Sequence, residues 1–225
     1  MNIKENLKSI TSNLPKEVTL VAVSKTKPVS DLLEAYEAGQ RIFGENKIQE
    51  MVAKHEEMPK DIEWHMIGHI QRNKVKYMAP FVSLIHGVDS LRLLAEINKQ
   101  ALKNNRTINC LLQIKIASEE SKFGLTETEV SQLLASEEYK SFQNIKIIGL
   151  MGMATFTSDQ EQLQEEFSIL KNIYDKLSGE ESNNSQLKTL SMGMSADYPI
   201  AIKNGSTMIR VGSSIFGNRT CNIDL

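Results

Sequence analysis

The sequence has 225 residues, of which 40% are hydrophobic and 24% are charged, so the chain can bury a sizeable core and stay in solution. Its 5 prolines and 12 glycines are too few for a disordered or fibrous chain. The formal net charge of -2 argues against a nucleic-acid partner, which would need a basic face, and no apolar run is long enough to span a bilayer.

The first predicted element is an amphipathic helix, because apolar residues recur at helical spacing from Ile3 to Leu14. After it, short β-branched runs alternate with longer amphipathic segments. The predicted strands cover residues 18–23, 41–43, 64–67, 82–85, 108–116, 145–150, 187–190 and 207–211. The predicted helices cover residues 30–38, 47–57, 72–78, 90–103, 161–177 and 198–203. A further helix begins after Thr126, with Glu129 at the capping-box spacing, and residues 178–186 form a polar loop.

Eight strands separated by helices in one chain of this length predict an α/β protein, a single (β/α)₈ TIM barrel with an extra N-terminal helix. An open, doubly wound sheet would give the same alternation, and the number of strands favours the barrel. No repeat or domain boundary is visible, so one domain is expected over residues 1–225. The two cysteines, Cys110 and Cys221, match no metal or redox spacing, and nothing resembles a signal peptide. A reducing, cytoplasmic protein without a metal site is therefore expected.

Residues that can carry chemistry follow the predicted strands, where a barrel places its active site. Lys25 follows the first strand, and its amine would enter the barrel mouth, where desolvation lowers a lysine pKa and favours attack on aldehydes. Ser195 precedes a short helix after the seventh strand, and Gly212 and Ser213 follow the eighth. Together they can bind a phosphate. A lysine beside a phosphate site implies a phosphorylated carbonyl ligand, of which pyridoxal 5′-phosphate (PLP) is the commonest in proteins.

Each of these residues also has a purely structural interpretation. Lys25 can be a solvated turn lysine, Asn46 an N-cap completed by Gln49, and Ser195 the cap of its own helix. Gly212 can be an ordinary turn glycine, and Arg210 a partner in a structural ion pair.

Other residues favour a structural role from the outset. His65 has the surroundings of a core histidine, and His69 those of a loop residue. The methionine-rich stretches at 151–153 and 192–194 favour packing.

Six motifs in this order resemble one known family over residues 18–217, and the combination is specific although no single motif is. They are Val21-Ala22-Val23-Ser24-Lys25-Thr26, Phe43-Gly44-Glu45-Asn46, Trp64-His65-Met66-Ile67-Gly68, Gly149-Leu150-Met151-Gly152-Met153, Leu190-Ser191-Met192-Gly193-Met194-Ser195-Ala196-Asp197 and Arg210-Val211-Gly212. The sequence is similar to the pyridoxal phosphate homeostasis proteins, also called proline synthase co-transcribed homologues. That family is similar in fold to the barrel domain of alanine racemase.

The resemblance implies a cofactor site that holds PLP as a Schiff base on Lys25. It implies phosphate binding by Ser195, Gly212 and Ser213, Arg210 at the pyridine nitrogen and Asn46 near the ring. It also implies that Ser191 and Met192 line the pocket. Ser213 stands where many relatives have threonine, and it keeps the hydroxyl.

The function implied is intracellular PLP homeostasis, without efficient catalysis and with apo PLP-dependent enzymes as candidate recipients. Alanine racemase has a second domain that supplies a catalytic tyrosine across a dimer, whereas this sequence ends soon after its eighth strand, so a monomer is expected. Two alternatives stay open: a PLP-dependent amino-acid racemase, and an aldolase that forms a Schiff base on Lys25 without a cofactor.

Overall fold

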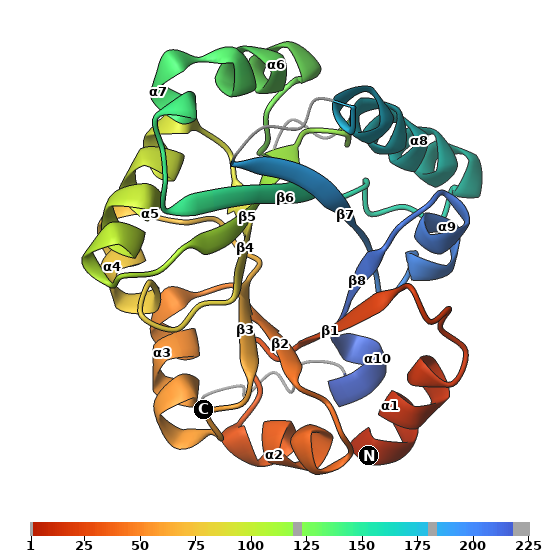
Figure 1. Ribbon diagram of the computed structural model, residues 1–225. Coiled ribbons are helices and arrows are strands. Elements are labelled where there is room, and N and C mark those ends of the chain that lie inside the picture. The colour runs from red at the N-terminus through yellow and green to blue at the C-terminus, as the bar shows by residue number, and fades with distance from the viewer. Residues whose placement is uncertain (1, 119–122, 180–183, 218–225) are drawn as a thin grey trace, which may run out of the picture.

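Eight parallel strands close into a barrel in which each strand pairs with the next along the chain and β8 pairs with β1 (Figure 1). The computed structural model describes residues 2–118, 123–179 and 184–217. The strands are β1 (Thr19–Val23), β2 (Ile42–Glu45), β3 (Glu63–Met66), β4 (Leu84–Val88), β5 (Ile108–Ile114), β6 (Ile145–Gly152), β7 (Ser185–Met194) and β8 (Met208–Val211). The barrel, and not the open sheet, is therefore the fold, as its eight strands predicted.

Helices surround the barrel and connect its strands (Figure 1). They are α1 (Ile3–Thr11), α2 (Val29–Glu37), α3 (Ile48–Glu57), the 3₁₀ turn η1 (Arg72–Lys74), α4 (Val75–Met78), α5 (Leu91–Lys103), α6 (Glu127–Ala135), α7 (Glu137–Lys140), α8 (Gln160–Leu177), α9 (Tyr198–Lys203) and α10 (Ser213–Phe216). The capping box of α6 is confirmed, since the Thr126 hydroxyl accepts from the backbone N–H of Glu129 and the Glu129 carboxylate accepts from that of Thr126.

The largest differences from the predicted elements concern β4, β7 and two four-residue helices. Strand β4 lies two to three residues beyond the predicted strand, because it carries His86 and Gly87 inside the barrel wall and these residues interrupt the apolar pattern. Strand β7 is longer than predicted and begins inside the predicted loop 178–186, of which residues 180–183 lie outside the described residues. Helices α7 and α10 are too short to show a helical period.

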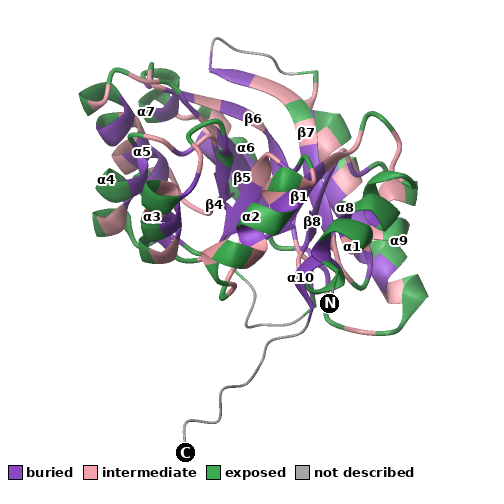
Figure 2. Ribbon diagram, turned by 90° about the horizontal axis from the view of Figure 1, so that it is seen from below, coloured by how far each residue is buried: buried purple, intermediate pink, exposed green. Residues whose placement is uncertain are grey.

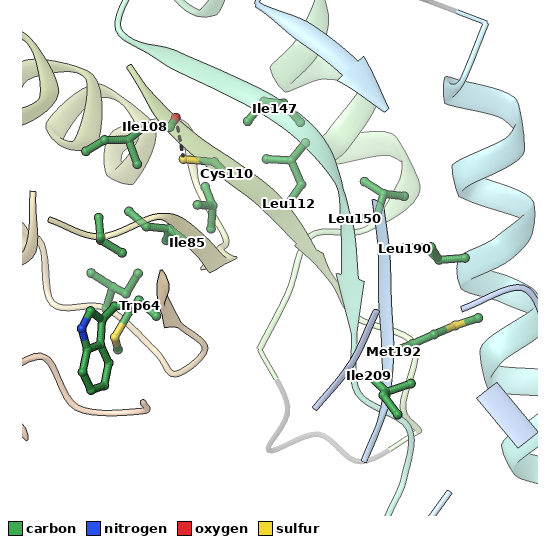
Figure 3. Packing of buried hydrophobic residues seen from close by; sticks show 14 of the residues in the cluster. Trp64, Ile85, Ile108, Cys110, Leu112, Ile147, Leu150, Leu190, Met192 and Ile209 are labelled. Carbon is green, nitrogen blue, oxygen red and sulfur yellow. Dashed lines mark hydrogen bonds between the residues drawn. The ribbon is translucent and has the colours of Figure 1, made fainter. Parts of the chain in front are cut away.

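The core has an outer part between the barrel and its helices and a smaller part inside the barrel. Figure 3 shows Trp64, Cys110 and Met192 among the packed residues of the outer part, and Figure 2 shows buried residues along the strands and on the inward faces of the helices. The interior part consists of one residue from each of five strands: Val21, Leu84, Leu111, Met151 and Met208. These side chains close the barrel below the residues that follow the strands.

The predicted N-terminal helix is confirmed as α1, which lies beside α10 and α2 (Figure 1). It buries Ile3, Leu7 and Ile10, and the Asn6 side-chain amide donates to the Ile215 carbonyl at 3.0 Å. Thus α1 supports the segment that follows β8. Within the described residues, none of the helices combines the length and hydropathy that crossing a membrane would require.

Candidate functional site

A cavity of about 790 Å³ opens at the carboxyl ends of the strands. Residues that follow or end seven of the strands line it, which is the position of active sites in barrels of this type. Six of the residues selected from the sequence meet there: Lys25, Asn46, Ser195, Arg210, Gly212 and Ser213. Because they come from the ends of β1, β2, β7 and β8, which are consecutive around the closed barrel, they occupy one side of the cavity.

Lys25 lies in a loop that is held on both sides. The Ser24 hydroxyl donates to Glu45 Oε1 at 2.6 Å, and the Thr26 backbone N–H donates to Glu50 Oε1 at 2.5 Å. Thr26 has φ of 64°, the left-handed conformation that threonine rarely adopts, so these contacts must offset a strained turn. The Lys27 ammonium donates to the Phe216 carbonyl at 2.8 Å, which ties the same loop to α10.

The two carboxylates that hold this loop share one buried lysine. Lys54 Nζ lies 2.7 Å from Glu45 Oε1, 2.7 Å from Glu50 Oε1 and 2.8 Å from the Ser24 carbonyl oxygen. Burial raises the pKa of Glu45, and the ion pair with Lys54 acts in the opposite direction. Contacts between α3 and the strand ends leave no pattern in a single sequence, so this cluster was not predicted. It fixes the backbone on either side of Lys25.

Asn46 does not cap the helix that follows it. Helix α3 begins at Ile48 after Lys47, without a side-chain cap, so the capping interpretation with Gln49 is wrong. Instead, Asn46 lines the cavity, and its Oδ1 is buried and has no hydrogen-bond partner among the described residues. A buried acceptor without a partner carries a cost, which a ligand that donates to it would remove.

Ser195 joins the loops that follow β7 and β8. Its Oγ accepts from the Gly212 backbone N–H at 3.1 Å, and Asp197, not Ser195, is the N-cap of α9. A Cβ added at Gly212 would lie 3.0 Å from the Val23 carbonyl oxygen and 3.2 Å from Val23 Cβ. Glycine at this position therefore allows the two loops to approach β1 closely and brings Ser195, Gly212 and Ser213 together at the cavity.

Arg210 projects from β8 into the barrel and lines the cavity. Its Nη1 donates to the Ser191 carbonyl at 2.9 Å and to Ser191 Oγ at 2.6 Å, and its Nη2 donates to the Gly152 carbonyl at 2.9 Å. Burial lowers the pKa of Arg210 to about 10, so the guanidinium keeps its charge at neutral pH. Because a guanidinium has five N–H donors, these three bonds leave two for a ligand.

The structure places neither Ser191 nor Met192 among the residues that line the cavity. Ser191 is fully buried beneath Arg210, and Met192 packs in the outer core (Figure 3). Successive side chains of a strand point to opposite faces, so Ser191 points into the barrel and Met192 away from it. The packing role of the methionine stretches holds for Met151 and Met192, but Met153 and Met194 line the cavity.

The opposite side of the cavity is mostly apolar and was not foreseen. Its lining residues come from the ends of β3, β5 and β6: Ile67, Gly68, His69, Gln113, Phe123, Met153 and Phe156. His69 stacks on Phe123 and lies 3.4 Å from the Asp89 carboxylate. Ile67, Gly68 and Met153 belong to the sequence motifs but were not assigned to the cavity, and the other four residues lie in no motif. Among the described residues, no three His, Cys, Asp or Glu side chains are grouped so that they could hold a metal ion.

The fold and the site define a (β/α)₈ barrel protein with a lysine, an arginine and two loops of small residues at its mouth. The family described as alanine racemase, N-terminal domain, matches residues 1–220, and the chain belongs to this family. The chain is 40% identical to the pyridoxal phosphate homeostasis protein of Vibrio alginolyticus over 233 aligned residues, which cover 97% of this chain and 98% of that protein.

Solved structures agree with this assignment. PipY of Synechococcus elongatus PCC7942, determined with PLP bound, has 35% sequence identity and a TM-score of 0.87, and the match covers 96% of this chain and 100% of PipY. An alanine racemase of Clostridium difficile 630 has a TM-score of 0.81 at 16% identity, covering 98% of this chain and 61% of the racemase, a likeness that shows the fold alone.

Proposed function

We propose that the protein binds PLP as a Schiff base on Lys25 and takes part in intracellular PLP homeostasis. The observation that carries the proposal is that the lysine, the anion-binding loops and the arginine line one cavity. The names of the relatives and the PLP bound to PipY support PLP over a phosphorylated aldolase substrate. A single domain over residues 1–225 would carry this function.

The residues of the cavity fit PLP. Lys25 would supply the amine for the covalent link, and Ser195, Gly212 and Ser213 would hold the phosphate. Arg210 would donate to the pyridine nitrogen with a donor left over from its bonds to Ser191 and Gly152. Asn46 Oδ1 is a buried acceptor without a partner, and it would accept from a polar substituent of the ring. When bound, PLP supplies an aldehyde for amines and a ring that delocalises negative charge.

The proposal is for a carrier and not for an efficient enzyme. The relatives carry the name of homeostasis proteins, which supports this choice over a racemase. Apo PLP-dependent enzymes are the proposed recipients. The protein would act in the cytoplasm as a monomer, with no nucleic-acid or membrane partner.

The experiment locates the covalent link. Protein incubated with PLP is reduced with borohydride, digested and mapped by mass spectrometry, and the adduct is expected on Lys25. The matched variants are Lys25→Met and Lys27→Met, which remove neighbouring lysines of the same cavity. Lys25→Met is expected to fold and to lose the adduct and the visible absorbance, whereas Lys27→Met keeps both. An adduct on Lys27, on another lysine or on none contradicts the proposal.

A further inference from the structure

A chain of buried polar side chains crosses the interior of the barrel below the cavity. It begins at Arg210 on β8, whose Nη1 lies 2.6 Å from Ser191 Oγ on β7. Ser191 Oγ lies 3.1 Å from Nδ1 of His86 on β4, and His86 Nε2 lies 3.1 Å from Nδ1 of His65 on β3. All four residues are buried, with at most 4% of their surface exposed.

Arg210 determines the direction of the first hydrogen bond and the direction in which the others can run continuously. A guanidinium can only donate, so Ser191 Oγ accepts from it. Ser191 keeps its own hydroxyl hydrogen, which it can donate to His86 Nδ1 when His86 carries its hydrogen on Nε2. That hydrogen is donated to His65 Nδ1. In this continuous arrangement both histidines are neutral and carry their hydrogen on Nε2.

Burial agrees with neutral histidines. It lowers the pKa of His65 to about 3, and it lowers that of His86 well below its ordinary value, with His65 and Arg210 adding to the effect. Neither ring takes up a proton near neutral pH. Two neutral rings are compatible with a fixed hydrogen-bond arrangement beside Arg210.

Filling the barrel does not require these polar residues. Leu84 and Met208 lie two residues before His86 and Arg210 on the same strands, so they share the interior face, and there the barrel is closed by apolar packing. Buried polar networks are no more stabilising than apolar side chains of similar volume. Of these four polar residues, Arg210 lines the cavity, and His65 at the other end is buried.

We propose that Ser191, His86 and His65 are positioning residues that hold the Arg210 guanidinium in one orientation toward the cofactor ring. The proposal rests on the PLP-binding function proposed above and adds three residues to it. Ser191 then acts on the cofactor through Arg210, which accounts for a site motif that includes this serine although its side chain does not line the cavity. Without the hydrogen bonds that link it to Ser191, His86 and His65, the Arg210 guanidinium would keep its charge but lose its fixed orientation.

The test uses PLP labelled with ¹⁵N at the pyridine nitrogen and bound to the full-length protein. Its ¹⁵N chemical shift reports whether the ring nitrogen is unprotonated, and the ³¹P shift reports on the phosphate end. His86→Phe breaks the chain. His86→Gln restores it, because the amide oxygen can accept from Ser191 and the amide nitrogen can donate to His65. Leu84→Ala, on the same strand and face, is the control for a loosened barrel interior. Ser191→Ala, which removes only one hydroxyl, replaces His86→Phe if that variant does not fold.

The wild-type protein and Leu84→Ala are expected to show one unprotonated ¹⁵N shift. His86→Phe is expected to move it upfield, toward the protonated value, with the ³¹P shift unchanged. PLP is also expected to dissociate about tenfold faster, the loss that follows when one good hydrogen bond to a charged group is weakened. His86→Gln is expected to return both quantities toward wild type.

Two results overturn the inference while PLP stays on Lys25: a wild-type ¹⁵N shift in His86→Phe and Ser191→Ala, or the same displacement in Leu84→Ala. Failure of the proposed function is recognised separately, because wild-type protein would then carry no borohydride-fixed adduct on Lys25.

Discussion

Ser195 shows how one hydroxyl can join two loops at the proposed phosphate site. Its oxygen accepts from the Gly212 backbone N–H at 3.1 Å, so its own hydrogen can be donated to a ligand in the cavity. Gly212 in turn lies against Val23 so closely that a side chain would push the loop away from β1. The proposed phosphate site therefore depends on a contact between loops as much as on the charge of any one residue.

Ser195→Ala is therefore expected to weaken binding of PLP far more than binding of pyridoxal, which lacks the phosphate. Hydrogen bonds to charged groups contribute roughly 1.5–3 kcal/mol each, which corresponds to about a tenfold to hundredfold loss for PLP. Titration of both ligands into the same variant, followed by visible absorbance, measures the difference, with pyridoxal as the internal control. Equal losses of affinity for the two ligands would show that Ser195 does not bind the phosphate.

Individual residues of the site were predictable where a strand end identifies them. Lys25, Asn46 and Arg210 were found in this way, because barrel topology brings strand ends together. Ser191 and Met192 were predicted in the pocket from their motif alone. Because side chains alternate along a strand, Ser191 lies beneath Arg210 and Met192 lies in the outer core. Contacts between strands distant in sequence, such as that of His86 with Ser191, leave no trace in a single sequence.

At the scale of elements, helix α3 and strand β2 hold the Lys25 loop through one ionic cluster. Lys54 on α3 neutralises Glu45 at the end of β2, and the side chains of the pair are 7% and 0% exposed. Glu45 Oε2 has no hydrogen-bond partner among the described residues, so the carboxylate depends heavily on this lysine. Removing one partner of a buried pair leaves an uncompensated charge, which costs far more than the pair contributes.

Lys54→Met is expected to lower the free energy of unfolding by roughly 3–5 kcal/mol at pH 8. Burial already raises the pKa of Glu45, and the loss of Lys54 raises it further. Glu45 then binds a proton more readily in the folded state than in the unfolded state. The loss in free energy of unfolding therefore becomes smaller as the pH falls through the raised pKa of Glu45.

Urea denaturation of the cofactor-free protein at pH 8 and at pH 5 measures both effects. Lys171→Met is the control, since it breaks the exposed pair with Asp175 and is expected to cost at most about 1 kcal/mol. If Lys54→Met lowers the free energy of unfolding no more than this control, the cluster does not hold the loop. If the loss is the same at pH 8 and pH 5, ionisation of Glu45 is not its cause.

The order of strands and helices was predictable because the barrel repeats a strand followed by a helix, and each predicted strand is present. The first and last residues of the elements were less predictable. Short helices such as α10 form because neighbouring elements hold them, as Asn6 does through the Ile215 carbonyl. Polar residues inside the barrel, such as His86, also interrupt the apolar pattern that marks a strand.

At the scale of the whole molecule, the closed barrel divides its cavity into two unlike sides. The polar side lies at β7, β8, β1 and β2, and the apolar side lies at the ends of β3, β5 and β6. A racemase needs acid–base groups on both faces of the α-carbon of its substrate. Lys25 lies on the polar side, but the described residues that line the cavity include no tyrosine, and His69 stacks on Phe123 beside Asp89.

Exchange of the α-proton of L-alanine is therefore expected to be absent or very slow in the PLP-loaded protein. A positioned acid or base contributes typically 10²–10⁴-fold, and among the described cavity residues no tyrosine faces Lys25 from the apolar side. In addition, Arg210 stays protonated with a pKa of about 10, so it favours a neutral ring nitrogen, and a neutral ring stabilises negative charge at the α-carbon only weakly. Proton NMR in deuterated water follows the α-proton signal directly, with Lys25→Met as the control for exchange that does not involve the site. Loss of the signal at about 1–10³ per second, a rate typical of enzymes, would favour the racemase over the carrier and would make His69 the first candidate for the second acid–base group.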